Sequence, residues 1–191
     1  MSEPRRAEWD ERHRDKPAGE AEPFLTAMLA RIPRGDALDV AAGRGRNALA
    51  LARAGMRVVA VDFSSEAMRL LAATARAARV AIWPVVANLD SFHLKDESLD
   101  AIVNINFLDR ALFPKFERAL RPGGVLLVDT FLIDQAAIGH PRDPRFLLAR
   151  GELRALADGF EIEEYREGLV TNSNGARAFR ASMLARRRKC N

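Results

Sequence analysis

The sequence predicts a three-layer α/β fold built on a mostly parallel, seven-stranded sheet whose last strand is antiparallel. Apolar segments with strand character alternate with segments of helical periodicity from residue 37 to residue 131. This alternation is typical of a parallel sheet with helices on both faces. The last two strand-like segments are joined only by the short polar stretch 171–175. Such a loop has no room for a crossover helix, so these two strands must be antiparallel neighbours.

The first half of the chain reads as a helix followed by a βαβ unit and a further strand. The expected elements, in order, are a helix over 22–32, a strand over 37–40, a helix over 46–54, a strand over 57–61, a helix over 66–78 and a strand over 80–86. Gly55 stops the second helix, and Ser64 with Ser65 introduces the third. Pro84 interrupts the last of these strands. Because proline cannot donate to a strand ladder, we expect that strand at an edge of the sheet.

The second half continues the same pattern. The expected elements are a strand over 99–105, a helix over 110–120, a strand over 125–131, a short helix near 151–157, and strands over 160–169 and 176–184. The apolar runs at 99–105 and 125–131 have the near-continuous hydrophobicity of buried parallel strands.

Length and composition predict one compact domain. A chain of 191 residues, 48% of them hydrophobic, can bury a substantial core without disulfides or a structural metal. We expect three parts: a charged, flexible N-terminal arm at 1–20, a folded domain at 21–185, and a basic tail at 186–191. No long apolar stretch predicts a membrane span, and the first residues lack the apolar core of a signal peptide.

Cysteine content and charge narrow the function classes. The only cysteine, Cys190, provides neither a disulfide framework nor a thiol cluster for a metal, so we expect no metal and a cytoplasmic location. The net charge of +4 arises largely from the terminal run 186–189. A charged tail of this kind is most often a solvated surface. The oligomeric state is not indicated by any of these features.

A glycine turn after the first strand is the most informative feature of the sequence. The strand over 37–40 contains Asp39 near its end and leads through Gly43 and Gly45 into a helix. Glycines let a ligand approach the backbone closely, and the start of the helix offers unpaired N–H groups. Asp62 ends the second strand about twenty residues further on, where a carboxylate can accept hydrogen bonds from ribose hydroxyls. The pattern predicts a ribose-bearing ligand.

Several motifs together resemble the class I S-adenosylmethionine-dependent methyltransferases. The motif Asp39-x-Ala-Ala-Gly43-x-Gly45 resembles their first motif, and 46–52 is similar to the small tellurite-resistance-type branch. Further matches are 61–64, 87–89, 104–108 and the closing region from Gly151 to 167. The resemblance implies a Rossmann-like methyltransferase fold. Two departures are Ala41-Ala42, where the family often has Gly-Cys or Gly-Ser, and Asn88, where Asp is common.

The resemblance also implies roles for individual residues toward S-adenosylmethionine. Asp39, Ala41, Gly43 and Gly45 would surround its methionine half. Asp62 would hold the ribose, Phe63 would pack on the adenine, and Asn88 and Leu89 would meet the adenine edge. Asn104 and Asn106 would lie near the amino acid moiety and the reacting methyl group. All these positions fall at the carboxyl ends of predicted strands, where open α/β sheets bind ligands.

Three further candidates have two interpretations each. Arg46 either reaches the cofactor carboxylate or an anionic acceptor, or it is a solvated residue of the first helical turn. Trp9 either lines the site, where its ring face would attract the sulfonium cation, or simply packs the arm. Phe107 either belongs to the site or to the core.

The expected activity is transfer of one methyl group to a small molecule, with S-adenosylhomocysteine as the second product. The sulfonium is already an activated donor, so a soft acceptor such as a thiol or a chalcogen oxyanion needs no base. A hydroxyl or amine acceptor would need one, and the candidates are then His140, His13 and Tyr165. Lone histidines are more often structural or solvated.

Two rival functions remain open at this point. An NAD-dependent oxidoreductase is possible because Gly43, Gly45, Ala48 and Asp62 also satisfy the dinucleotide fingerprint. The antiparallel end of the chain argues against it. A methyltransferase that acts on RNA through the basic tail is the second rival, but the scarcity of aromatic residues for stacking on bases argues against a nucleic-acid partner.

Overall fold

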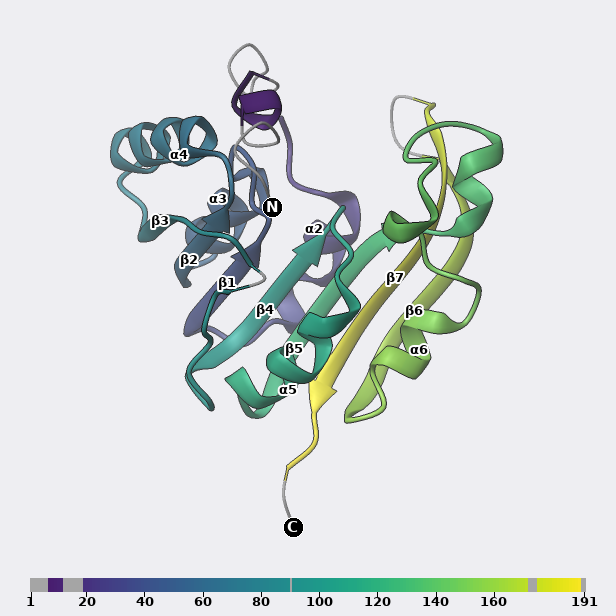
Figure 1. Ribbon diagram of the computed structural model, residues 1–191. Coiled ribbons are helices and arrows are strands. Elements are labelled where there is room, and N and C mark those ends of the chain that lie inside the picture. The colour runs from purple at the N-terminus through teal and green to yellow at the C-terminus, as the bar shows by residue number, and fades with distance from the viewer. Residues whose placement is uncertain (1–6, 12–18, 90, 172–174, 190–191) are drawn as a thin grey trace. The chain divides into compact units, whose positions relative to one another are not determined.

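The computed structural model describes residues 7–11, 19–89, 91–171 and 175–189 (Figure 1). By their internal contacts, the described residues fall into two compact units, within 1–94 and within 95–191. His13 and Cys190, which the sequence analysis discussed, lie outside the described residues. No helix in the described ranges is long and apolar enough to cross a membrane.

The first unit contains three parallel strands with helices before and between them. Its elements are α2 (Pro23–Met28), the 3-10 turn η1 (Leu29–Arg31), β1 (Asp36–Val40), α3 (Arg46–Arg53), β2 (Arg57–Asp62), α4 (Ser65–Ala78) and β3 (Ile82–Val86). β2 pairs with β1 on one side and β3 on the other. Both crossovers are helical, as parallel neighbours require.

Local sequence signals explain where these helices begin and end. The Ser64 side chain accepts a hydrogen bond from the Ala67 N–H and caps α4. The expected single helix over 22–32 is shorter in the structure, because the chain tightens into η1 after Met28. Ile32 precedes Pro33, and the residue before a proline disfavours the α conformation. Pro84 lies in β3, which is an edge strand as predicted.

The second unit contains four strands and several short helices. Its elements are β4 (Leu99–Ile105), η2 (Arg110–Leu112), α5 (Phe113–Ala119), β5 (Leu120–Phe131), η3 (Ile133–Ala137), η4 (Pro144–Phe146), α6 (Glu152–Leu156), β6 (Phe160–Thr171) and β7 (Arg177–Arg187). The predicted helix over 110–120 is therefore divided into η2 and α5. β5 begins at Leu120, earlier than predicted, and its pairing with β4 is irregular between Leu99 and Ala101.

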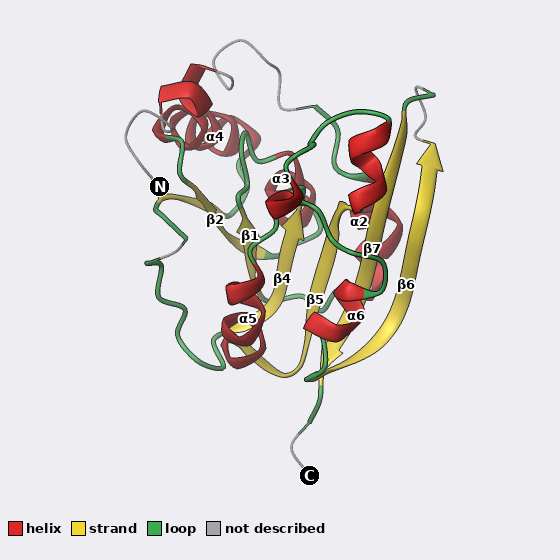
Figure 2. Ribbon diagram, turned by 45° about the vertical axis from the view of Figure 1, so that its right-hand side comes forward, coloured by secondary structure: helices red, strands yellow, loops and turns green. Residues whose placement is uncertain are grey.

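The two long final strands form an antiparallel pair, labelled β6 and β7 in Figure 2. β7 pairs with β5 on its other side, also antiparallel, so it is inserted between β5 and β6. This confirms the antiparallel ending predicted from the short loop at 171–175. β7 also extends further than predicted, through Arg186 and Arg187.

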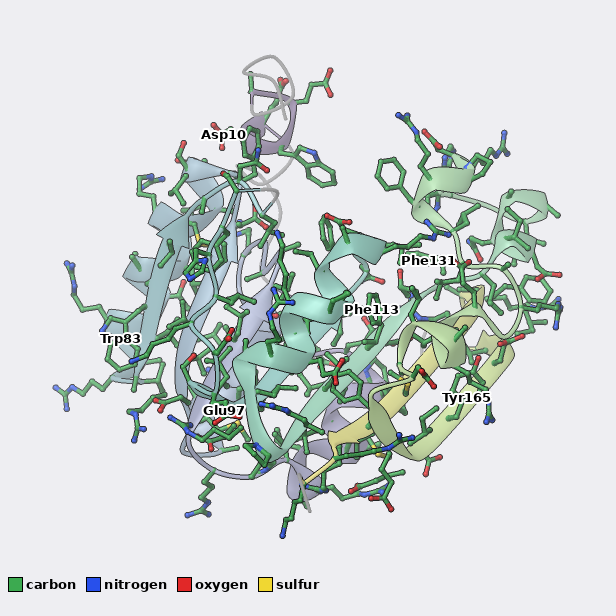
Figure 3. All side chains as sticks on the ribbon, turned by 60° about the horizontal axis from the view of Figure 1, so that its bottom comes forward. Asp10, Trp83, Glu97, Phe113, Phe131 and Tyr165 are labelled. Carbon is green, nitrogen blue, oxygen red and sulfur yellow. The ribbon has the colours of Figure 1, made fainter. Side chains whose placement is uncertain are left out.

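Each unit has its own apolar core. In the first unit the fully buried side chains include Leu38, Leu51 and Leu71. In the second they include Phe113, Phe116, Ile102, Leu126 and Leu127, and the Phe113 and Phe116 rings lie 6.0 Å apart. Phe113 is labelled in Figure 3.

The strands are ordered β3-β2-β1-β4-β5-β7-β6 in a seven-stranded sheet. Six strands are parallel and β7 is antiparallel, which confirms the predicted α/β fold class.

Candidate functional site

The turn between β1 and α3 is built from residues with left-handed backbone conformations. Ala41, Gly43 and Gly45 have φ values of 51°, 53° and 78°. Glycine adopts this region freely, whereas alanine does so only with strain. Gly45 is also required by packing, because a Cβ there would overlap the Leu71 side chain and lie 2.9 Å from its Cγ. The turn therefore brings the backbone N–H groups at the start of α3 close to the end of β1.

Asp62 ties this turn to the end of β2. One carboxylate oxygen accepts a hydrogen bond from the Gly43 N–H at 2.7 Å, and the other accepts from the Ser64 N–H at 2.8 Å. The residue is 9% exposed. Asp62 and the glycine turn, which the sequence predicts to act together, are thus in direct contact.

Asp39 lies beneath the turn and is 1% exposed. Its carboxylate accepts a hydrogen bond from the Ala48 N–H at 3.0 Å. The pKa of Asp39 is raised to about 7, chiefly by burial and also by the negative charge of Asp62, while the hydrogen bond from the Ala48 N–H and the charge of Arg46 lower it. Because a positive charge nearby favours the ionised form, this carboxyl is suited to a cationic ligand.

Arg46 has a protein partner. Its Nη2 lies 2.5 Å from the Glu22 carboxylate, and its Nη1 donates to the Glu20 carbonyl at 3.3 Å. The Glu22 N–H in turn donates to the Asn47 Oδ1 at 3.0 Å. These contacts fasten the chain before α2 to the first turn of α3, so Arg46 is not simply a solvated residue.

The N-terminal segment contacts the first turn of α4. Residues 7–11 are helical, and Asp10, labelled in Figure 3, accepts hydrogen bonds from Ser64 Oγ at 2.5 Å and from the Glu66 N–H at 3.1 Å. Trp9 is 41% exposed. The N-terminal segment is therefore held by hydrogen bonds to residues that follow Asp62, the last residue of β2.

The ends of β2 and β3 carry the remaining candidates of the first unit. Phe63 and Leu89 are buried, and Asn88 is half-buried. The Ala87 N–H donates to the Asp62 carbonyl at 3.0 Å, which keeps the chain leaving β3 beside the end of β2. The candidates of the first unit that follow β1, β2 and β3 therefore lie at one edge of its sheet.

Asn104, in the second unit, is a buried amide without a partner. It lies in β4 and has no exposed surface. Neither its Oδ1 nor its Nδ2 has a hydrogen-bond partner among the described residues. An unsatisfied buried amide is costly, so such a group in a folded protein calls for a ligand or ordered water.

Asn106 follows β4 in a left-handed conformation with φ of 58°. Its N–H donates to the Asp129 carbonyl at 2.9 Å, and its Oδ1 accepts from Arg180 Nη2 at 2.8 Å. Phe107 beside it is half-buried. Sequence reasoning missed Arg180 and Asp129, although Asp129, the single charged residue of the apolar run 125–131, is a signal that was available.

The candidate bases Tyr165 and His140 differ in their surroundings. The Tyr165 hydroxyl donates to Glu167 at 2.5 Å, and the Arg154 guanidinium lies 3.9 Å from the ring centroid. Burial, followed by Glu167, raises the pKa of Tyr165 to about 12, so at neutral pH it keeps its proton. Tyr165, labelled in Figure 3, stays a weak candidate base on these grounds. His140 is exposed, and its carbonyl accepts from Gln135.

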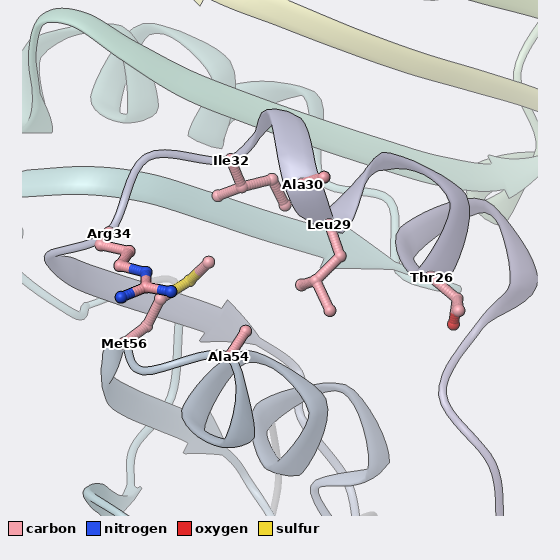
Figure 4. A pocket seen from close by; sticks show the side chains of 7 residues that line it. All are labelled: Thr26, Leu29, Ala30, Ile32, Arg34, Ala54 and Met56. Carbon is pink, nitrogen blue, oxygen red and sulfur yellow. The ribbon is translucent and has the colours of Figure 1, made fainter.

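A hollow of about 580 Å³ lies elsewhere in the first unit (Figure 4). It is lined by Thr26, Leu29, Ala30, Ile32, Arg34, Ala54 and Met56. Arg34 precedes β1 and Met56 precedes β2, so the hollow lies at the amino ends of these strands. Ligands of open α/β sheets bind at the carboxyl ends.

Comparison with known proteins supports the same fold. Residues 37–124 match the family model described as a methyltransferase domain. A comparison of the sequence with curated proteins gave no match.

Solved structures resemble the chain over most of its length. One, from work on the conversion of a disulfide bond into a thioacetal group during echinomycin biosynthesis, is 24% identical with a TM-score of 0.74, covering 96% of this chain and 93% of the other. TehB from Haemophilus influenzae is 24% identical with a TM-score of 0.73; the match covers 87% of this chain but spans only 61% of TehB.

A third structure contains the product of the cofactor. It is the 1,6-didemethyltoxoflavin-N1-methyltransferase of Burkholderia thailandensis with bound 1,6-didemethyltoxoflavin and S-adenosylhomocysteine. It is 18% identical, with a TM-score of 0.69 and coverage of 96% of this chain and 87% of the other. At these identities the likeness concerns the fold. Together with the match of residues 37–124 to the methyltransferase domain model, it shows that the chain has the Rossmann-like α/β fold of a methyltransferase domain.

Proposed function

We propose that the chain transfers the methyl group of S-adenosylmethionine to a small molecule with a soft nucleophilic atom, such as a thiol or a chalcogen oxyanion. The observation that carries the proposal is the pair of hydrogen bonds by which the Asp62 carboxylate joins the glycine turn to the end of β2. A carboxylate has about four acceptor positions, so two remain for ribose hydroxyls.

Asp62 would then bind the ribose of the cofactor, and Phe63, Asn88 and Leu89 would contact the adenine. The methionine half would lie against the turn from Asp39 to Gly45. Asp39 suits the methionine half because its buried carboxyl gains its charge most readily beside a cation, and the cofactor has both an ammonium and a sulfonium. Ala41, Gly43 and Gly45 provide the close backbone approach.

Asn104 and Asn106 are proposed to bind near the amino acid moiety and the reacting methyl group. Support for Asn104 comes from its two unsatisfied amide atoms, which need a partner. Phe107 is kept as a candidate beside them. Trp9 and Arg46 are weaker candidates, because Arg46 is already paired with Glu22 and Trp9 is on an exposed segment.

The bound cofactor supplies an activated methyl group on a positively charged sulfur. In the transfer, the carbon–sulfur bond breaks as the acceptor–carbon bond forms, and the electron pair of the broken bond stays on sulfur. The protein's contribution is in-line orientation, which can account for roughly 7–11 kcal/mol of the barrier.

A soft acceptor is favoured because it needs no base, and among the candidate bases Tyr165 has a pKa raised to about 12, chiefly by burial. A thiolate or a chalcogen anion attacks without a base. Three neighbours give the proposal a chemical context: work on a thioacetal, a TehB protein and a toxoflavin-type N-methyltransferase. Membership of the tellurite-resistance-type branch and the cytoplasmic location stay predictions.

The RNA alternative is weakened by the partners of the basic residues near the C-terminus. Arg186 Nε lies 2.5 Å from the Glu163 carboxylate, and Arg187 Nη2 lies 3.1 Å from the Glu97 carboxylate. Arginines already paired with carboxylates contribute less to phosphate binding.

The test is calorimetric titration with S-adenosylhomocysteine. The wild-type chain should bind, and Asp62→Ala should weaken binding at least about tenfold, since a charged hydrogen bond contributes about 1.5–3 kcal/mol. Asp36→Ala is the matched control, because Asp36 lies at the opposite end of β1 in an exposed pair with Arg57. Equal binding by wild-type and Asp62→Ala would refute the assigned pocket. The same titration with NADH tests the alternative of an NAD-dependent oxidoreductase.

The acceptor is then sought by screening thiols, selenium and tellurium oxyanions and small amines for release of S-adenosylhomocysteine. Turnover with thiols or chalcogen oxyanions is the expected result. Turnover restricted to amines or hydroxyl compounds would contradict the proposed acceptor class, while leaving the cofactor assignment intact.

A further inference from the structure

We propose that Arg180 is a positioning residue. It holds Asn106 in a left-handed conformation and thereby sets the shape of the turn that follows β4. This inference rests on the proposed function, in which that turn is part of the cofactor site.

The left-handed conformation of Asn106 is held by two polar contacts. Its φ of 58° lies in a region that asparagine enters more readily than most L-residues but that is still uncommon. Its N–H donates to the Asp129 carbonyl, and the same carbonyl accepts from Arg180 Nη2 at 3.0 Å. Nη2 also donates to Asn106 Oδ1. The backbone and side chain of Asn106 are thus joined to β5 and β7 through one carbonyl and one guanidinium nitrogen.

Arg180 is itself fixed in place. Its Nε donates to Asp129 Oδ1 at 2.8 Å, and the side chains of the pair are only 9% and 3% exposed. The guanidinium carbon lies 4.6 Å from the centroid of the Phe131 ring, which Figure 3 labels. A planar guanidinium directs its N–H groups in fixed directions, so its contact with Asn106 has a defined geometry.

The contact lies where a ligand is expected. Asn106 comes directly after the carboxyl end of β4, and open α/β sheets bind ligands outside these strand ends. Asn104, two residues earlier, has the unsatisfied buried amide. A purely structural role for the Arg180–Asp129 pair would not require any bond to Asn106.

Ser182 supplies a matched control. Its Oγ donates to the same Asp129 Oδ1 at 2.9 Å, and the residue is 5% exposed. Within the described part of the chain, Ser182 makes no hydrogen bond to Asn106. Ser182→Ala therefore disturbs the buried Asp129 without disturbing the turn directly.

The experiment is a double-mutant cycle on S-adenosylhomocysteine affinity, measured by calorimetry on the full chain. The variants are Arg180→Lys, Asn106→Gly and the double variant. Lysine keeps the charge beside Asp129, but it lacks the fork that reaches both acceptors. Glycine adopts the left-handed conformation without a side-chain bond.

Arg180→Lys should weaken binding about tenfold in the wild-type background and less than about threefold in the Asn106→Gly background. Ser182→Ala should stay within about twofold of wild type. An equal loss in both backgrounds, or an equal loss in Ser182→Ala, would overturn the inference. Arg180→Lys that binds like wild type would overturn it as well.

Thermal unfolding of each variant shows whether it folds. If Arg180→Lys does not fold, the cycle is repeated with Arg180→Gln/Asp129→Asn, which removes both buried charges together. Failure of the proposed function can be told apart from failure of this inference. If the wild-type chain does not bind S-adenosylhomocysteine, the proposed function and the role of Arg180 are both overturned. If binding is lost in Asp62→Ala but the Arg180 and Asn106 effects are additive, only the role of Arg180 is overturned.

Discussion

The Asp62 carboxylate accepts a hydrogen bond from the backbone N–H of Gly43 at 2.7 Å, across 19 positions of sequence. This bond joins the turn after β1 to the end of β2, so Asp62, the residue proposed to bind the ribose, is also part of the scaffold. Cofactor affinity and fold stability should therefore respond together to changes at this residue.

Asp62→Ala should lower the free energy of unfolding by about 2–4 kcal/mol, because the N–H groups of Gly43 and Ser64 both lose a charged acceptor. Asp62→Asn keeps one carbonyl oxygen and should lose about half as much. Urea unfolding measures both. Asp36→Ala, which breaks an exposed pair with Arg57, should cost no more than about 1 kcal/mol; a comparable loss there would contradict the explanation.

Asp39 should make the protein less stable as the pH rises from about 4 to about 7. Its pKa is raised from 3.8 to about 7 in the folded state. In that window the folded chain keeps a proton that the unfolded chain has released, so unfolding loses a proton and the free energy of unfolding falls with pH. The stability that this proton provides is fully present below the unfolded pKa and is lost as the pH passes the folded pKa.

The decline should approach 1.4 kcal/mol per pH unit for this one group, or about 4 kcal/mol over the window. Asp39→Asn cannot ionise and keeps an oxygen for the Ala48 N–H, so its stability should lack this component. Urea unfolding at several pH values compares the two chains. Parallel curves for wild type and variant would show that Asp39 does not titrate as described.

Much of this site was accessible from sequence because its signals are local. Asp39 and Asp62 lie in the last residues of β1 and β2, and the glycines follow β1 directly. The ends of parallel strands meet at one edge of a sheet. Arg180 and Asp129 were missed because they are 51 residues apart and meet only through the register of β5 and β7. The early start of β5 was missed because Pro122, Gly123 and Gly124 read as a turn.

Ala41→Gly should stabilise the fold by about 0.5–1 kcal/mol. Ala41 has a φ of 51°, a conformation that costs an L-residue roughly 1–2 kcal/mol. Glycine removes this strain, but part of the gain in stability is lost because glycine increases the conformational entropy of the unfolded chain. Ala42→Gly is the control, since Ala42 is buried and has no positive φ, and it should destabilise. Thermal unfolding of the two variants should thus move in opposite directions.

Gly45→Ala should destabilise the fold by about 2–4 kcal/mol, the sum of backbone strain and overpacking. The new Cβ would overlap Leu71, a side chain with no exposed surface and therefore little room to move. Gly151→Ala separates the two causes, because Gly151 has nearly the same φ, 76° against 78°, but nothing within 4 Å of the added Cβ. It should cost only the conformational part, about 1–2 kcal/mol. The double variant Leu71→Ala/Gly45→Ala should lose less free energy of unfolding than the sum of the two single losses, because Leu71→Ala removes the atoms that collide with the new Cβ. Strictly additive losses in urea unfolding would show that the strain at Gly45 is conformational alone.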